Sequence, residues 1–154
     1  MKENTATFKF PLGIEAWSNL SGFRGIVISR SENLNQCNRY YIAPKVDKDG
    51  KLPDGYYFDE NEIETERIHT PTFIEFKHPL GVEAESNITG MRGIIIACSI
   101  HINGCFQYFI KPRVDRDGKL PDGSWLNENE VVIIKSEQIN RGKKTTGGFP
   151  SRIL

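Results

Sequence analysis

The sequence shows no excess of charge of either sign and no long apolar run. Its 20 Lys and Arg residues balance 20 Asp and Glu residues. Nucleic-acid binding depends on clustered Lys and Arg, whereas the chain up to Glu137 is slightly acidic, with 16 basic against 20 acidic residues. No apolar stretch approaches the ~18 residues of a membrane helix, and the start of the chain does not look like a secretory signal. We therefore expect a cytoplasmic protein that does not enter a membrane.

Cysteine and histidine are both scarce, and neither follows a ligand pattern. The three cysteines form an odd set without a Cys-x-x-Cys pair, which favours free thiols in a reducing compartment. The three histidines are not at metal-ligand spacing, and neither a Gly-x-Ser-x-Gly elbow nor a phosphate-binding glycine loop occurs. The sequence thus predicts no metal, no cofactor and no catalytic residue, and we expect a protein that is not an enzyme.

Two acidic motifs have structural explanations. Residues 47–50, Asp-Lys-Asp-Gly, resemble part of a calcium loop, but Lys45 and Tyr56 then occupy the end positions that need oxygen ligands. A hairpin turn with Asp-Gly at its tip explains the motif better. The acids Asp59, Glu60 and Glu62 are interpreted as a solvated strand edge, which also discourages edge-to-edge pairing.

An internal repeat dominates the sequence. Residues 8–65 align without a gap with residues 76–133, at a constant offset of 68, and 32 of the 58 aligned positions are identical. The longest shared string, Asp-Gly-Lys-Leu-Pro-Asp-Gly, begins at Asp49 and again at Asp117. We predict repeat 1 at 8–65, a linker at 66–75, repeat 2 at 76–135 and a basic, weakly ordered tail at 136–154. Units this small are marginal alone, so the two repeats are expected to pack together.

Each repeat has the pattern of short β-strands. In repeat 1 we predict strands at 14–18, 26–28, 40–42 and 56–58 and near Ile63, separated by turn-forming residues. Alternation places Tyr40 and Tyr108 in the core and leaves Tyr41 and Phe109 half exposed. Five short strands without a helical period predict an all-β protein of two tandem, small SH3-like barrels.

The repeated motif resembles a known group of proteins. Each unit carries a Gly-x-Arg-Gly-Ile string, then Cys-x-x-Tyr-x-Ile-x-Pro, Val-Asp-x-Asp-Gly-Lys-Leu-Pro-Asp and an aromatic residue. This pattern is similar to a family of short phage and prophage proteins that usually hold one copy and are mostly of unknown function. The resemblance implies a phage-encoded protein in the cytoplasm of a bacterial host, where small inhibitors of host defence are common. Among the positions that differ, repeat 2 has Phe106, Gln107 and Asn127 where repeat 1 has Asn38, Arg39 and Asp59. Any ligand contact made by these side chains would differ between the repeats.

Eight residues are candidates for ligand or partner contact. Arg24 and Arg92 lie between glycines and are suited to grip a phosphate or carboxylate, although pairing with Glu15 and Glu83 is an alternative. Lys51 and Lys119 lie in the repeated loop. The other four candidates are aromatic residues that could stack a base, receive a partner's side chain or belong to the core: Tyr41, Tyr57, Phe109 and Trp125.

These residues leave several binding functions open. The leading hypothesis is a non-enzymatic inhibitor of a host anti-phage system, which either blocks a host defence protein or sequesters a nucleotide second messenger. The alternatives are a nucleic-acid-binding accessory protein, for which only the tail is basic, and a minor virion component. Self-association also stays open.

Overall fold

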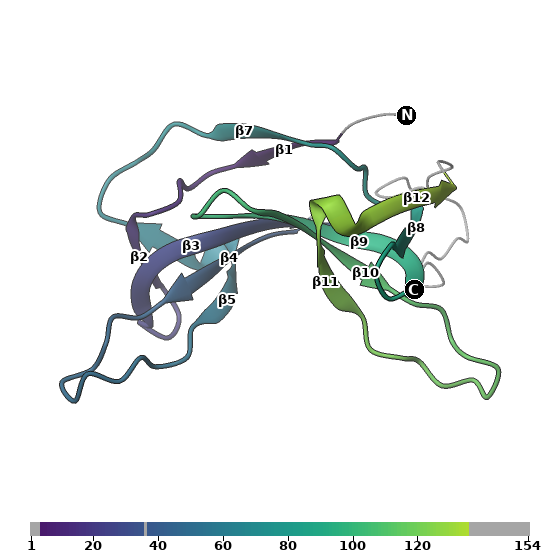
Figure 1. Cartoon of the computed structure of the whole chain (residues 1–154). Helices are drawn as coiled ribbons and strands as arrows, with labels where there is room; N and C mark the ends of the chain where they lie inside the picture. Colours follow the sequence, from purple (N-terminus) through teal and green to yellow (C-terminus); the bar gives the residue numbers. More distant parts are fainter. Residues whose placement is uncertain (1–3, 36, 136–154) are drawn as a thin grey trace, which may run out of the picture.

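The computed structural model describes residues 4–35 and 37–135, which form an all-β protein with two short 3-10 helices (Figure 1). The first repeat contains β1 (Asn4–Phe8), β2 (Glu15–Ser18), β3 (Arg24–Asn33), β4 (Asn38–Ala43), β5 (Tyr56–Asp59), η1 (Glu60–Glu62) and β6 (Ile63–Thr65). The second contains β7 (Thr72–Phe76), β8 (Glu83–Ser86), β9 (Arg92–His101), β10 (Phe106–Lys111), β11 (Ser124–Asn127), η2 (Glu128–Glu130) and β12 (Val131–Lys135). The all-β prediction is confirmed, and each repeat has the five predicted strands plus one more.

The additional strands are β1 and β7, which the sequence analysis did not predict. They pair with each other in an antiparallel ribbon, in which Ala6 lies opposite Ile74. Most of β7 belongs to the segment that we interpreted as a linker. The other ten strands form one sheet, and the ribbon crosses one face of it (Figure 1).

The long strands β3 and β9 join the two repeats. They pair antiparallel over five residue pairs centred on Ser31, which lies opposite Ser99. The edge of β3 is divided, because residues 24–26 pair with β2 and residues 29–33 pair with β9. Ser31 and Ser99 are 68 residues apart, as are Ala6 and Ile74, so a pseudo-two-fold axis passes through both the sheet and the ribbon.

The described strands form no closed barrel. A closed five-stranded unit would need its two outer strands, β5 and β6, to pair with each other. Instead β5 pairs only with β4 and β6 pairs only with β2, while η1 connects them. The free half of the β3 edge is taken by β9 of the other repeat. The tandem SH3-like barrels are therefore not confirmed, and the repeats share one open sheet.

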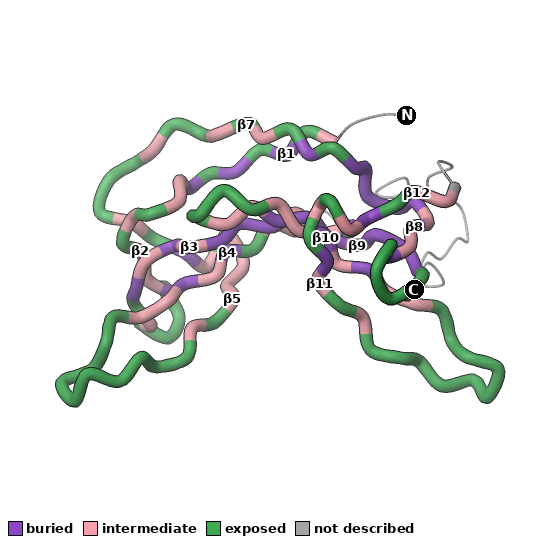
Figure 2. Tube along the Cα trace, viewed as in Figure 1, coloured by how far each residue is buried: buried purple, intermediate pink, exposed green. Residues whose placement is uncertain are grey.

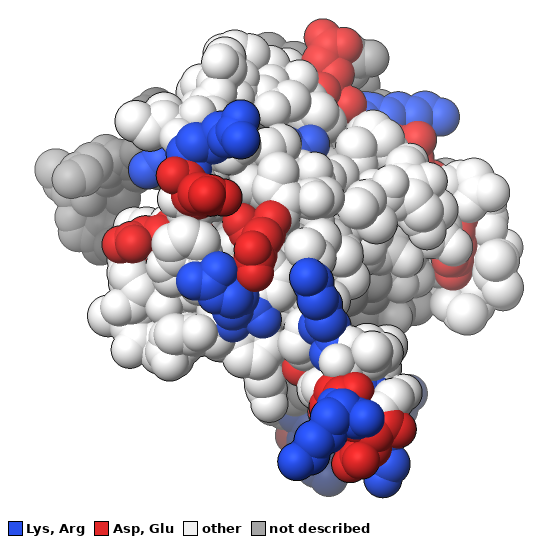
Figure 3. All heavy atoms as spheres, turned by 90° about the vertical axis from the view of Figure 1, so that its left-hand side faces the viewer, with Lys and Arg blue, Asp and Glu red and all other residues white. Residues whose placement is uncertain are grey.

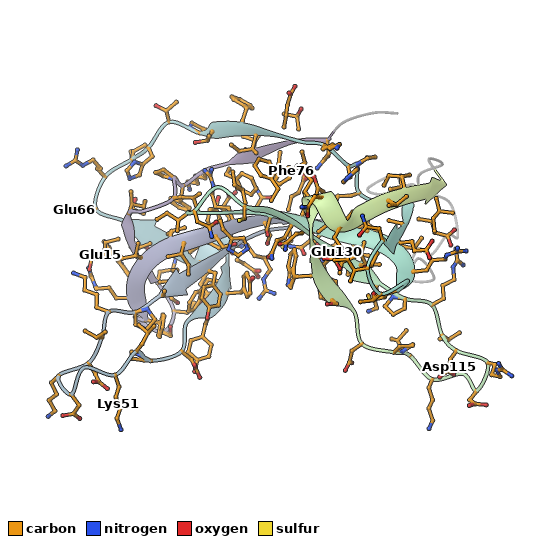
Figure 4. The ribbon with its side chains drawn as sticks, viewed as in Figure 1. Glu15, Lys51, Glu66, Phe76, Asp115 and Glu130 are labelled. Carbon is orange, nitrogen blue, oxygen red and sulfur yellow. The ribbon has the colours of Figure 1, made fainter. Side chains whose placement is uncertain are left out.

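The main core lies between the ribbon and the sheet. Phe8 and Phe76 are fully buried, contact each other edge to face and pack on Tyr40 and Tyr108 respectively. Figure 2 shows the buried positions concentrated in the central strands, with a few more in the ribbon, and Figure 4 shows Phe76 between these two layers. The prediction that Tyr40 and Tyr108 are core residues is confirmed.

Within the described residues, no helix has the length and apolar character needed to cross a membrane. The predicted basic tail, 136–154, lies outside the described residues.

Candidate functional site

The face of the sheet opposite the ribbon, here called the lower face, carries four of the predicted residues. Tyr41 lies opposite Tyr57 on neighbouring strands, with ring centroids 4.9 Å apart. Phe109 lies opposite Trp125 in the same way, with centroids 5.3 Å apart. All four side chains are half-buried, so each ring packs on its partner and still presents an edge or face to solvent. Burial, and secondarily Tyr41, raise the pKa of Tyr57 above its ordinary value.

A row of polar residues runs between the two aromatic pairs. Cross-strand register places six side chains along it: Asp59, Arg39, Ser31, Ser99, Gln107 and Asn127. The two serines are buried at the pseudo-two-fold axis beneath the longer side chains that flank them. The lower face therefore has a polar centre with an aromatic pair on each side.

The two ends of this row differ in charge but keep the same contact. Arg39 Nε donates to Asp59 Oδ1 at 3.1 Å, and both side chains are about half exposed. In repeat 2, Gln107 Nε2 donates to Asn127 Oδ1 at 3.0 Å. An ion pair has thus been replaced by an amide pair at the equivalent position. The lower face is symmetric in shape and asymmetric in charge.

Two loops extend beyond the lower face, at 44–55 and 112–123 (Figure 1). In the first loop, Asp47 Oδ1 accepts hydrogen bonds from the backbone N–H groups of residues 49 and 51, both at 2.9 Å. Gly50 has φ of +79°, which favours glycine. Asp115 and Gly118 repeat this geometry. The Asp47 oxygen thus accepts hydrogen bonds within its own turn, which is the geometry expected of the predicted hairpin turn.

Lys51 and Lys119 lie in these loops, where residues 45–54 and 113–122 are all exposed. Each loop carries three basic and three acidic residues. Figure 3 shows both signs of charge gathered at the end of the first loop, and Figure 4 shows Lys51 and Asp115 in the two projecting loops. The lysines therefore belong to charge-balanced tips and do not form a basic cluster.

Arg24 and Arg92 are exposed, but each interacts with a carboxylate. Arg24 Nη1 lies 3.2 Å from Glu15, and its guanidinium stacks on Trp17 with 4.2 Å between Cζ and the ring centroid. Arg92 Nη2 lies 3.3 Å from the carboxylate of Glu85, which occupies the position equivalent to Trp17. The ion pair of Arg92 is therefore with Glu85, whereas Glu83 was the expected partner. Neither arginine is placed against the aromatic pairs by any described contact.

The glycine beside each arginine has a role in strand packing. A Cβ atom built on Gly25 would lie 2.3 Å from the Ala43 carbonyl oxygen, and one on Gly93 would lie 2.3 Å from the Lys111 carbonyl oxygen. These glycines therefore permit close approach of a neighbouring strand, not the approach of a ligand.

The acidic cluster after β5 is also structural. Tyr40 donates a hydrogen bond to the Glu60 carboxylate, and Ser18 Oγ donates to Glu62 Oε2 at 2.9 Å. These two acids thus hold η1 against the sheet, and the interpretation as a purely solvated edge is wrong for them. Within the described residues, no group of His, Cys, Asp and Glu could hold a metal ion.

A cavity of about 570 Å³ lies on repeat 1, and the sequence analysis missed it. Its aromatic lining comes from the β2–β3 turn and from β5: Phe23, Tyr56, Tyr57 and Phe58. Ser21, Gly22 and Glu62 complete the lining. One signal was present in the sequence, because the aromatic positions 23, 56 and 58 become Met91, Ser124 and Leu126 in repeat 2. The loss of all three aromatic residues in one repeat marks these positions as a group.

No family model, no curated protein and no solved structure matches the chain significantly. The fold and the exposed features therefore carry the functional argument. They describe an all-β protein with an aromatic lower face and two projecting loops.

Proposed function

We propose that the protein is a non-enzymatic binding protein that contacts a partner protein with its lower face and its two loops. The observation that carries this proposal is the preservation of the loops. Residues 44–55 and 112–123 are identical at 10 of 12 positions, and both differences exchange Lys for Arg. The remaining aligned positions are identical at only 22 of 46. The most exposed segments have thus diverged least since the duplication.

The fold accounts for only part of this identity. Asp47 and Gly50 are required by the turn, and Gly55 by a close approach to the Ile42 carbonyl oxygen. Val46 and Leu52 are 59% and 72% exposed and have no packing role that would preserve them. Their equivalents Val114 and Leu120 are also exposed. Paired apolar side chains at the ends of projecting loops are suited to insertion into a partner's surface.

The geometry favours a protein partner over a nucleotide. Phosphate binding requires available cations, whereas Arg24 and Arg92 interact with carboxylates and each loop has a net charge of zero. A standard interface buries about 800 Å² on each partner, and we propose that the lower face and both loops contribute to it. The resemblance to phage proteins supports a host defence protein in the bacterial cytoplasm as the target and inhibition as the outcome.

The test is affinity capture with crosslinking from bacterial host cells, followed by mass spectrometry. A variant with Val46→Ser, Leu52→Ser, Val114→Ser and Leu120→Ser should lose the partner that the unmodified protein captures. The matched control, Ile68→Ser with Ile88→Ser, removes two exposed apolar side chains from outside the loops and should retain it.

Three results would contradict the proposal. The loop variant could capture the partner as well as the unmodified protein does. Calorimetry could show binding of a cyclic dinucleotide or an ADP-ribose derivative, which would favour sequestration of a signal. A gel shift that survives deletion of residues 136–154 would favour nucleic-acid binding instead.

A further inference from the structure

The cavity on repeat 1 has the construction of an aromatic cage. The Phe23 and Tyr56 rings are nearly perpendicular, at 83°, with centroids 5.2 Å apart. The Phe58 ring lies 5.5 Å from Phe23 with an interplanar angle of 31°. Phe23 and Phe58 are half-buried and Tyr56 is 57% exposed, so the rings form the walls of an open site. The three rings line one open site, and the parts of their faces that these contacts leave free carry partial negative charge.

The charge of the lining matches the rings. Glu62 is the one charged residue among the lining residues, and neither Lys nor Arg lines the cavity. Its carboxylate is held in place by Ser18, which is 1% exposed and donates to Oε2 at 2.9 Å. Ring faces and a fixed carboxylate both attract positive charge.

We propose that this cavity binds a quaternary ammonium compound. Such a cation is weakly hydrated, so it can leave water for the ring faces, whereas a metal ion would require more oxygen ligands than this site offers. The volume of about 570 Å³ exceeds that of a lone ammonium group and lies within the usual range of ligand pockets.

Repeat 2 retains the carboxylate and lacks the cage. Ser86 Oγ donates to Glu130 Oε2 at 2.9 Å, as in repeat 1. Met91, Ser124 and Leu126 replace the three rings. The shared Ser–Glu contact is thus part of the common fold, and the aromatic walls are specific to repeat 1. We expect one cation site in each chain, and Tyr57 belongs both to its lining and to the lower face.

The experiment titrates the full isotope-labelled chain with choline and, separately, with its uncharged isostere 3,3-dimethylbutan-1-ol, observed by NMR. Choline should shift the signals around Phe23 and Tyr56 with a single site and should bind at least about tenfold more tightly than the alcohol. The variant Phe23→Met, Tyr56→Ser, Phe58→Leu, which installs the residues of repeat 2, should lose at least about tenfold in affinity. Glu62→Gln should also weaken binding.

Equal affinity for choline and for the alcohol would overturn the proposal, because a plain apolar cleft would then explain the site. Unchanged choline binding in the triple variant, or shifts confined to repeat 2, would overturn it as well. Unchanged signals from repeat 2 show that the triple variant folds. If it does not fold, Tyr56→Ser alone provides the measurement, because that side chain is mostly exposed and its loss leaves the core intact.

Discussion

Separating the repeats tests the architecture directly. A fragment that begins at residue 69 contains β7 to β12 and loses both inter-repeat pairings, β3 with β9 and β1 with β7. Because the pseudo-two-fold places Ser31 opposite Ser99, a second copy of the fragment can replace repeat 1 in the same register. We predict a homodimer in which β9 pairs with β9 around Ser99 and β7 pairs with β7 around Ile74.

The free-energy cost of separating the repeats follows from the loss of the covalent connection between them. A short tether gives an effective concentration of about 1 mM, so fragments at 10 μM lose a factor of about 100, or about 2.7 kcal/mol, relative to the joined chain. Each tenfold increase in fragment concentration should restore about 1.4 kcal/mol. The unfolding midpoint of the fragment should therefore rise with concentration, while that of the whole chain should not.

Analytical ultracentrifugation and urea unfolding at two concentrations provide the assay. A folded monomer with a concentration-independent midpoint would refute the argument, because it would show that repeat 2 has a sufficient core of its own. An unfolded fragment at every concentration would refute the predicted self-pairing.

Three substitutions test the interior. Gly25→Ala should destabilise the chain by about 2 kcal/mol in thermal unfolding, because the new Cβ would collide with the Ala43 carbonyl oxygen 2.3 Å away; no change would mean that the strands can separate without cost. Burial lowers the pKa of His78 in the folded state, so the unfolded chain takes up the proton first. The free energy of unfolding should therefore fall as the pH drops below about 6.5. His78→Phe, which introduces the residue type found at this position in repeat 1, should reduce that loss. Tyr108→Phe removes a hydrogen bond of 2.9 Å to the Glu128 carboxylate and should cost about 1–2 kcal/mol in urea unfolding; a neutral effect would mean that this bond does not hold η2 against the sheet.

Local patterns predicted the strands well, because side-chain alternation is a property of each strand. The burial of Tyr40 and the partial exposure of Tyr41 follow from this alternation. The same logic left Phe109 half exposed, whereas the pairing of Tyr41 with Tyr57 and of Phe109 with Trp125 depends on the cross-strand register. Barrel closure was not predictable in this way, since alternation fixes which face of a strand is buried and does not fix which strand occupies each edge.

The features that were missed depend on contacts between the repeats or on differences between them. The pairing of β3 with β9 leaves no local signature in the sequence, because the same β3 residues could equally pair with a strand of their own repeat. Strand β7 lies where a polar linker was predicted, and its core residue Phe76 was assigned to repeat 2. The cavity was missed because its rings are separated by over 30 positions in the sequence and are absent from the other copy.

The central junction has a consequence for how the two halves can evolve. In an assembly of identical chains, every residue beside the axis must tolerate its own duplicate. Here Arg30 is buried, donates to the Phe10 carbonyl oxygen at 3.1 Å and lies over the Phe8 ring, while its counterpart Cys98 is a small buried thiol. Two identical halves would bring either two guanidinium groups or none into this interior. The joined chain is free of that constraint, so one guanidinium and one thiol occupy the two equivalent positions.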